Sequence, residues 1–262
     1  MSRLMAWFLG PFLLIGCATG PREFHPVDPI SPEAVSHQAF GEVLQQHVMN
    51  GQVNYPAVAG DSRFGEYLGL FNRVDPSRLS AQEDRLAFWI NAYNAFAIKG
   101  ILDGYSPASL WGRYRYFIGR DYEVGGNQIN LYDLEREVLV REFREPRLHF
   151  AIVCASQSCP PLRSEAYEAR RLSAQLDDNA RRFINDPSKN RFDRTSRTAS
   201  LSMIFKWFQE DFEAYSGSLA AYVAQFVADP DLARELKADG YRIEFLEYDW
   251  SLNGVPPHDH PS

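Results

Sequence analysis

Residues 86–98 place apolar side chains on every face of the helix that they predict. Ser80 and Glu83 have the spacing of a capping box ahead of this segment, and Asp103 and Gly104 mark its end. A helix that is apolar on all sides has to be covered on all sides. We therefore expect it in the middle of a domain, with the other elements packed around it.

Two polar residues, Asn91 and Asn94, interrupt this apolar helix. They are three positions apart and therefore share one face. A buried carboxamide without a partner costs about 1 to 3 kcal/mol, so each must be hydrogen-bonded. Two interpretations remain open: the carboxamides bind the backbone of neighbouring loops, or they line a ligand site.

The rest of the sequence predicts helices and short strands that do not alternate regularly. Helical spacing extends over 31–50, 80–103, 134–143, 173–185, 203–212 and 219–227, and strand patterns over 148–153, 191–193, 199–201 and 241–245, with a hairpin over 122–131. A hydrophobic fraction of 45% suffices for a substantial core. We expect a single, mostly helical α+β domain over 32–253 with a small antiparallel sheet.

The predicted strand 148–153 ends in a loop that contains Cys154 and Cys159. The small and polar residues of this loop, followed by Pro160 and Pro161, cannot continue the strand. Loops that follow a rigid element often contain binding or catalytic residues. The cysteines are compatible with two functions, one catalytic and one not.

The catalytic interpretation is a thiol-dependent hydrolase or transferase that acts on peptide or cell-envelope material. Cys154 or Cys159 is then the nucleophile and His149 the base, with Asn91 or Asn94 orienting the imidazole. If the chain between them is extended, His149 and Cys154 lie about 16 Å apart, whereas base and nucleophile must be about 3 Å apart. Catalysis therefore requires the loop to fold back, which would bring Cys159 over His149 more easily.

The second interpretation, which we favour, is a binding or envelope-assembly module in which Cys154 and Cys159 form a disulfide. Exported proteins meet an oxidising compartment, and two cysteines on one loop are within bridging reach. So small a ring contributes only about 2 kcal/mol, so the bond would shape the loop more than hold the fold. His149 is then a hydrogen-bonded core histidine.

The first residues have the pattern of a bacterial lipoprotein signal. Arg3 precedes an apolar run over 5–15 that is too short to span a bilayer, and Leu-Ile-Gly-Cys at 14–17 is a cleavage and lipidation box. We expect residues 1–16 to be removed and Cys17 to be acylated. The residue after the cysteine is Ala18 and not an aspartate. In this respect the segment resembles the signals of Gram-negative lipoproteins that reach the outer membrane.

This signal predicts a protein that is held at the outer membrane by its lipid and faces the periplasm. Residues 17–31 then comprise the lipidated cysteine and a proline-rich flexible tether, and residues 254–262 a disordered tail. The expected partners are the membrane, through the lipid, and a periplasmic protein or cell-envelope ligand.

Composition and missing motifs exclude other functions. Removing Arg3 with the signal takes the net charge from −7 to −8, which argues against binding to nucleic acid. No phosphate-binding loop or dinucleotide fingerprint is present, and we expect no cofactor. We expect no metal site either, because His37 and His47 have no third ligand nearby in sequence, and His258 and His260 lie in the expected tail.

Several separated blocks resemble one known family. The blocks are FWINAYNA at 88–95, PRLHFA at 146–151, CASQSCPP at 154–161, ARRFIND at 180–186 and IFKWF at 204–208. In this order they resemble the family called domain of unknown function 547, over about residues 75–215. As a distant analogy, a buried helix followed by a strand with a histidine is similar to papain-like and transglutaminase-like enzymes. In those enzymes the nucleophilic cysteine opens the helix, and this helix has no cysteine.

Overall fold

Helix α4 (Gln82–Leu102) runs through the middle of the structure, as its all-round apolar pattern predicts. All of residues 86–98 are buried. The capping box expected at Ser80 is wrong: the helix is capped by Ala81, whose side chain makes no hydrogen bond. The turn before the helix is held by Arg85, which donates to the carbonyl oxygens of Leu79 and Ser80.

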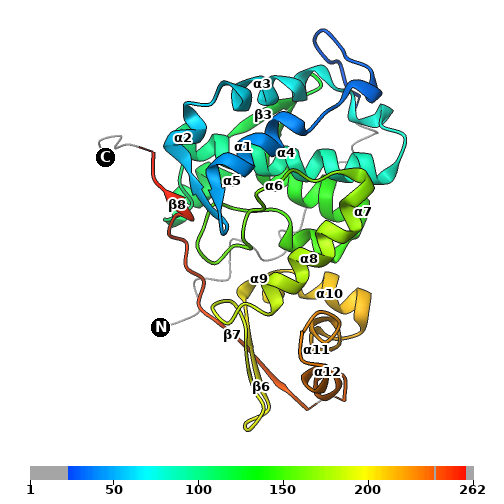
Figure 1. Cartoon of the computed structure of the whole chain (residues 1–262), viewed down its shortest axis with the longest axis vertical. Coiled ribbons are helices and arrows are strands. Elements are labelled where there is room, and N and C mark those ends of the chain that lie inside the picture. Colours follow the sequence, from blue (N-terminus) through cyan, green and yellow to red (C-terminus); the bar gives the residue numbers. More distant parts are fainter. Residues whose placement is uncertain (1–22, 239, 258–262) are drawn as a thin grey trace.

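The computed structural model describes residues 23–238 and 240–257 (Figure 1). The predicted signal peptide, Cys17 and the last residues of the predicted tail, 258–262, lie outside the described residues. No helix within the described ranges is both long and apolar enough to cross a membrane.

Residues 23–31, expected to be part of a flexible tether, lie against the domain. The backbone N–H of His25 donates to Gly125 at 2.6 Å, and that of Ile30 donates to Arg73 at 3.0 Å. Phe24 packs against Trp89 of α4, with ring centroids 6.5 Å apart. The expectation from proline content fails here because these backbone bonds and this aromatic contact come from distant parts of the chain.

The N-terminal elements cover one side of α4. They are η1 (Pro32–Ala34), α1 (Gln38–His47), β1 (Val48–Met49), β2 (Gln52–Asn54), α2 (Tyr55–Ala59), α3 (Ser62–Leu70), η2 (Phe71–Arg73) and η3 (Pro76–Arg78). The single helix expected over 31–50 is therefore wrong at both ends. Val35 is extended, which separates η1 from α1, and residues 48–49 already form a strand.

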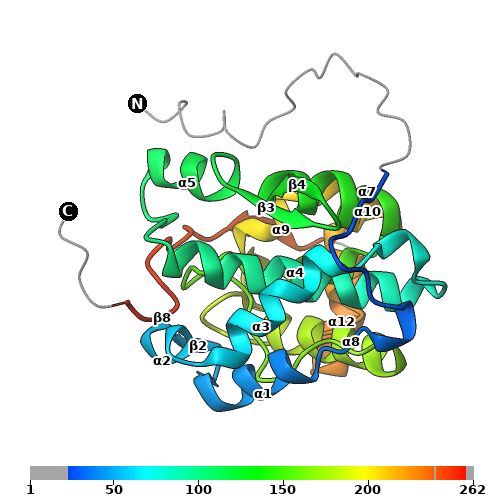
Figure 2. The ribbon, with the colours of Figure 1, turned by 90° about the horizontal axis from the view of Figure 1, so that it is seen from above.

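The opposite side of α4 carries α5 (Leu110–Phe117) and a hairpin of β3 (Asp121–Val124) and β4 (Asn127–Asn130) (Figure 2). The hairpin is confirmed, with Tyr122 paired to Ile129. Three helical pieces follow it, which agrees with the helical spacing of 134–143. They are α6 (Leu131–Asp133), the π-helix η4 (Leu134–Val140) and α7 (Arg141–Phe143).

The strand expected over 148–153 is wrong. Pro146 opens a 3-10 helix, η5 (Pro146–Phe150), and the N–H groups of Ala151 and Ile152 both donate to Leu148. The segment after η5 does not pair with a neighbouring strand; its backbone is bound by the side chain of Asn94 instead.

Most of the remaining elements form the lower part of Figure 1, whereas β8 lies beside α2. They are η6 (Ala169–Arg171), α8 (Leu172–Ile184), β5 (Arg191–Asp193), β6 (Thr198–Leu201), α9 (Met203–Trp207), α10 (Gln209–Ser216), α11 (Leu219–Val223), α12 (Pro230–Lys237), β7 (Arg242–Phe245) and β8 (Gly254–Val255). The expected helix 203–212 is split at Phe208, and α12 was not expected.

In the described part of the chain, the strands pair in three small sheets and not in one antiparallel sheet. The orders are β1-β2-β8, β3-β4 and β5-β6-β7, and both β8 and β7 pair in parallel with their neighbours. The tail expected from residue 254 therefore begins with a strand. Gly254 lies so close to β2 that a Cβ atom there would be 2.0 Å from the carbonyl oxygen of Val53, so only glycine fits.

Two clusters of buried side chains form the core. The larger surrounds α4 and includes side chains from α1 to the start of α8. The smaller combines Phe150 with the end of α8 and with α9 to α12. The structure is a single, mostly helical α+β domain, as predicted.

Candidate functional site

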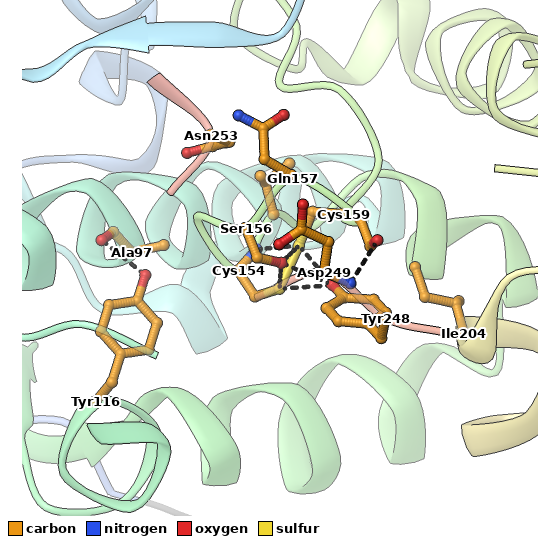
Figure 3. Close-up of a disulfide and its surroundings, with 12 residues drawn as sticks. Ala97, Tyr116, Cys154, Ser156, Gln157, Cys159, Ile204, Tyr248, Asp249 and Asn253 are labelled. Atoms are coloured by element: carbon orange, nitrogen blue, oxygen red, sulfur yellow. Dashed lines mark hydrogen bonds between the residues drawn. A yellow bond between two sulfur atoms is a disulfide. The ribbon is translucent and has the colours of Figure 1, made fainter. Parts of the chain in front are cut away.

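A disulfide joins Cys154 and Cys159 on the loop that follows η5, with the two Cα atoms 6.2 Å apart (Figure 3). Cys159 is buried, with 4% of its surface exposed, whereas Cys154 is half-buried. Cys154 is therefore the more exposed of the two cysteines.

Two hydroxyl groups surround the sulfur atoms. The Tyr248 hydroxyl lies 3.1 Å from Cys154 Sγ and 3.2 Å from Cys159 Sγ, and 2.9 Å from Ser156 Oγ. Ser156 Oγ itself lies 3.3 Å from Cys154 Sγ and 3.4 Å from Cys159 Sγ. Burial raises the pKa of Tyr248 well above its ordinary value, so the phenol stays protonated and can donate.

The loop backbone is held by a segment nearly a hundred residues further along the chain. Gln157 N–H donates to Ser251 at 2.7 Å, Ser158 N–H donates to Asp249 at 3.1 Å, and Asn253 N–H donates to Ala155 at 3.1 Å. Ala155 has φ 59°, a left-handed conformation that costs an alanine about 1 to 2 kcal/mol. Such a conformation persists only when surrounding contacts impose it.

Half-buried aromatic rings lie beside the disulfide. Tyr248 packs against Trp207 and Trp250, with centroid distances of 4.7 and 4.5 Å. The guanidinium of Arg113, on α5, lies 4.6 Å from the centroid of Trp250. We call Trp207, Tyr248 and Trp250 the aromatic cluster. Aromatic and arginine side chains of this kind are enriched at contact surfaces.

His149 lies in η5 and is bound elsewhere. Its Nε2 is 2.8 Å from Asp211 Oδ2, and its ring stacks on Phe208 at 3.8 Å between centroids. Its Nδ1 is buried and has no hydrogen-bond partner in the described part of the chain. Neither cysteine is among its contacts, so the structure does not form the base and nucleophile pair of the thiol-enzyme interpretation.

Asn91 and Asn94 each bind a backbone segment through both ends of the carboxamide. Asn94 donates to the carbonyl of Ala151 at 2.9 Å and accepts from Val153 N–H at 2.9 Å. Asn91 donates to the carbonyl of Tyr167 at 2.8 Å and accepts from its N–H at 2.9 Å. This is the first of the two interpretations, in which the carboxamides bind loop backbone, and Asn94 thereby fixes the chain that leads into Cys154.

An open cleft of about 980 Å³ lies elsewhere, between the start of α1, residues 163–170 and α8. It is lined by His37 and by charged side chains of both signs, among them Glu165 and Arg182. Burial lowers the pKa of His37 to about 4, and its Nδ1 lies 2.7 Å from the hydroxyl of Tyr67. His47 pairs with Asp61 at 2.9 Å, so the two histidines do not act together. No cluster of metal-binding side chains is found among the described residues.

Residues 76–184 match the family model described as a protein of unknown function, DUF547. Over this stretch, which is less than half of the sequence, the chain is similar to DUF547. The match runs from η3 to the end of α8, and is shorter than the 75–215 expected from the sequence blocks. No curated protein and no solved structure gives a significant match, so the analogy to papain-like and transglutaminase-like enzymes gains no support.

The DUF547 match covers only half of the site. It includes Cys154, Cys159, His149 and both asparagines, whereas Trp207, Tyr248 and Trp250 lie beyond it. Sequence reasoning missed the aromatic cluster for a related reason. Its members are far from the cysteine loop in sequence. Tyr248 reaches the sulfur atoms because the chain from residue 249 to 253 binds the loop backbone, and Trp207 and Trp250 pack against Tyr248.

Proposed function

We propose that this protein is an outer-membrane lipoprotein that faces the periplasm, and that its DUF547-like domain is a binding module for a cell-envelope ligand. The signal pattern that ends at Cys17 supports the location. The ligand surface is the half-buried Cys154 together with the aromatic cluster. The disulfide gives this surface its shape and is not itself a reactant.

One observation carries the choice of binding over thiol catalysis. The two candidate nucleophiles are bonded to each other, while the candidate base His149 is bound to Asp211. A thiol hydrolase or transferase needs a thiolate with a base in hydrogen-bond reach. For thiol catalysis the disulfide would have to be reduced, and His149 would have to leave Asp211 and contact a cysteine.

Aromatic rings beside an arginine favour a ligand with flat apolar faces and polar edges, as sugar rings and short peptides have. Fragments of peptidoglycan combine both and are present in the periplasm, so they are the probe of choice. We expect soluble peptidoglycan fragments to change the tryptophan fluorescence of the purified protein in a saturable way. Trp250→Ala should weaken this binding about tenfold, by loss of one ring contact.

Tyr215→Ala is the matched control, because Tyr215 is an aromatic residue with 62% of its surface exposed and is not part of the aromatic cluster. It should bind as the unaltered protein does. If Trp250→Ala and Tyr215→Ala bind equally well, or if no fragment binds, the aromatic cluster is not the ligand surface.

The location has a separate test. In cells, Cys17→Ala should no longer incorporate labelled fatty acid, and the protein should leave the outer-membrane fraction. A variant that carries no lipid and still fractionates with the outer membrane would show that something other than acylation holds the protein there.

A further inference from the structure

Helix α5 presents an apolar patch to solvent. Leu110, Trp111, Tyr114 and Ile118 have 60%, 67%, 40% and 39% of their surfaces exposed, and Trp111 stacks on Tyr114 at 5.2 Å. The other large apolar side chains that are exposed in the described ranges, Val27, Met49, Tyr215 and Val255, lie on separate elements. A contiguous exposed patch of this kind marks an interaction surface.

The opposite face of α5 anchors the helix to the domain. Tyr116 is fully buried, and its hydroxyl donates to the carbonyl of Ala97 on α4 at 2.8 Å. Phe117 packs edge-on against Trp250 with centroids 6.4 Å apart. The helix therefore has two apolar faces. One packs against the domain, and the other is exposed to solvent.

Helix α5 and the turns beside it carry arginines, although the whole chain is acidic and the exposed acids Asp121 and Glu123 follow on β3. Residues 104–120 contain Arg113, Arg115 and Arg120 and no Asp, Glu or Lys. Arg120 pairs with Asp103, whereas Arg113 and Arg115 have no carboxylate partner within the described ranges and lie over aromatic rings. An exposed patch of tryptophan and tyrosine with arginine beside it has the chemistry of a surface that enters an anionic lipid interface.

The path of the chain towards Cys17 puts the membrane on the same side. The carbonyl of Glu23, the first described residue, accepts a hydrogen bond from Asn127 of β4 at 2.7 Å. The hairpin β3-β4 and α5 lie on the same side of α4 (Figure 2). The chain between Cys17 and Glu23 reaches about 20 Å at most, so an acylated Cys17 keeps this side near the lipid.

We propose that the exposed face of α5 docks on the anionic phospholipid surface to which Cys17 tethers the protein. This inference rests on the proposed lipid anchor. The patch is small, so its affinity for lipid on its own is low. The tether raises its effective concentration at the membrane, and docking becomes an intramolecular step. The domain is then held in one orientation, with the aromatic cluster beside the membrane, because Trp250 contacts both Arg113 and Phe117 of α5.

The test uses the acylated protein, reconstituted in vesicles of phosphatidylethanolamine and phosphatidylglycerol with brominated acyl chains. Bromine quenches only tryptophans that enter the lipid. We expect quenching in the unaltered protein and about threefold less in Trp111→Phe, because Trp111 is the ring that enters. Trp207→Phe, with its ring in the aromatic cluster, is the matched control and should keep the quenching.

A second variant, Leu110→Glu with Ile118→Glu, leaves every tryptophan in place. Both side chains are exposed, so the fold should hold, and the quenching should fall as it does in Trp111→Phe. Protein that co-sediments with vesicles and shows equal quenching in all variants overturns the docking and leaves the anchor intact. Protein that is isolated from cells without acyl chains on Cys17 refutes the anchor instead. If the double variant changes the oligomeric state and not the quenching, the patch binds a second copy of the chain and the lipid proposal is wrong.

Discussion

His149 and Asp211 form a side-chain pair with 2.8 Å between Nε2 and Oδ2, and this pair joins η5 to α10. The imidazole also stacks on Phe208, so its position is fixed from two sides. Its role in the structure is to connect the chain before the disulfide loop to the smaller core cluster.

The first prediction concerns the reactivity of Cys154 and Cys159. Protein isolated from cells without reductant should have no alkylatable thiol at Cys154 or Cys159. After reduction, alkylation measured by mass spectrometry should be unaffected by His149→Ala, because the imidazole contacts neither sulfur atom. Tyr248→Phe should slow the alkylation of the reduced cysteines about tenfold. The thiolate then loses one hydrogen bond from the Tyr248 hydroxyl, which raises the pKa of the thiol. Fast alkylation of unreduced protein that depends on His149 would favour the thiol enzyme instead.

The second prediction concerns Asn94. Asn94→Ala leaves the carbonyl of Ala151 and the N–H of Val153 buried without partners. We expect the free energy of unfolding to fall by about 2 to 4 kcal/mol, measured by denaturant titration. Gln82→Ala is the control, because Gln82 is an exposed amide on the same helix, and should change stability by less than about 0.5 kcal/mol. Equal stability of the two variants would show that Asn94 is not a structural residue.

The third prediction concerns pH. The pKa of His37 is about 4 in the folded protein because burial disfavours the charged form, against an ordinary value of 6.5. The unfolded chain therefore takes up a proton below pH 6.5 that the folded protein does not accept until about pH 4. The contribution of His37 to the free energy of unfolding is complete above pH 6.5. It is lost as the pH falls towards 4, and the loss is at most about 3 kcal/mol.

His37→Gln should flatten the stability profile between pH 6.5 and 4. His25→Gln is the control, because the side chain of His25 is exposed, and should keep the profile of the unaltered protein. The measurement is thermal unfolding at a series of pH values. If stability falls with pH equally steeply in both variants, burial of His37 does not cause the loss of stability between pH 6.5 and 4.

The fourth prediction concerns charge. With a net charge of −8 after loss of residues 1–16, the purified domain should not bind duplex DNA at physiological salt. The basic segment around α5 has only three arginines, too few to outweigh the rest of the surface. Micromolar binding with a steep dependence on salt, in a fluorescence anisotropy titration, would contradict this.

Elements with a strong local pattern could be predicted from the sequence. The apolar run of α4, the Gly-Gly-Asn turn of the hairpin and the amphipathic spacing of α8 determine their own structure, because the period of apolar residues selects the side to be buried. The sequence also predicts that the carboxamides of Asn91 and Asn94 are hydrogen-bonded, since a buried carboxamide must have partners. It does not decide which groups those partners are.

Elements decided by distant contacts could not be predicted. The apolar run at 148–153 fits a strand, yet Asn94 takes the backbone groups that a strand would pair. The segment at 23–31 reads as a spacer, yet Gly125 and Arg73 bind its backbone. Tyr248 has no local pattern at all that connects it with the cysteines. Each of these contacts exists only after the chain has folded, so no window of the sequence contains it.

The pairing of β8 with β2 has a consequence for the order of assembly. Val53 pairs with Gly254, and the segment between Tyr248 and Asn253 lies along the cysteine loop on its way to that strand. We expect contacts between residues about two hundred positions apart to form late, because closing so long a loop is slow. The cysteines could then be oxidised on a loop that still lacks the hydroxyl group of Tyr248, and the site would be completed only when the segment from Tyr248 to Asn253 docks.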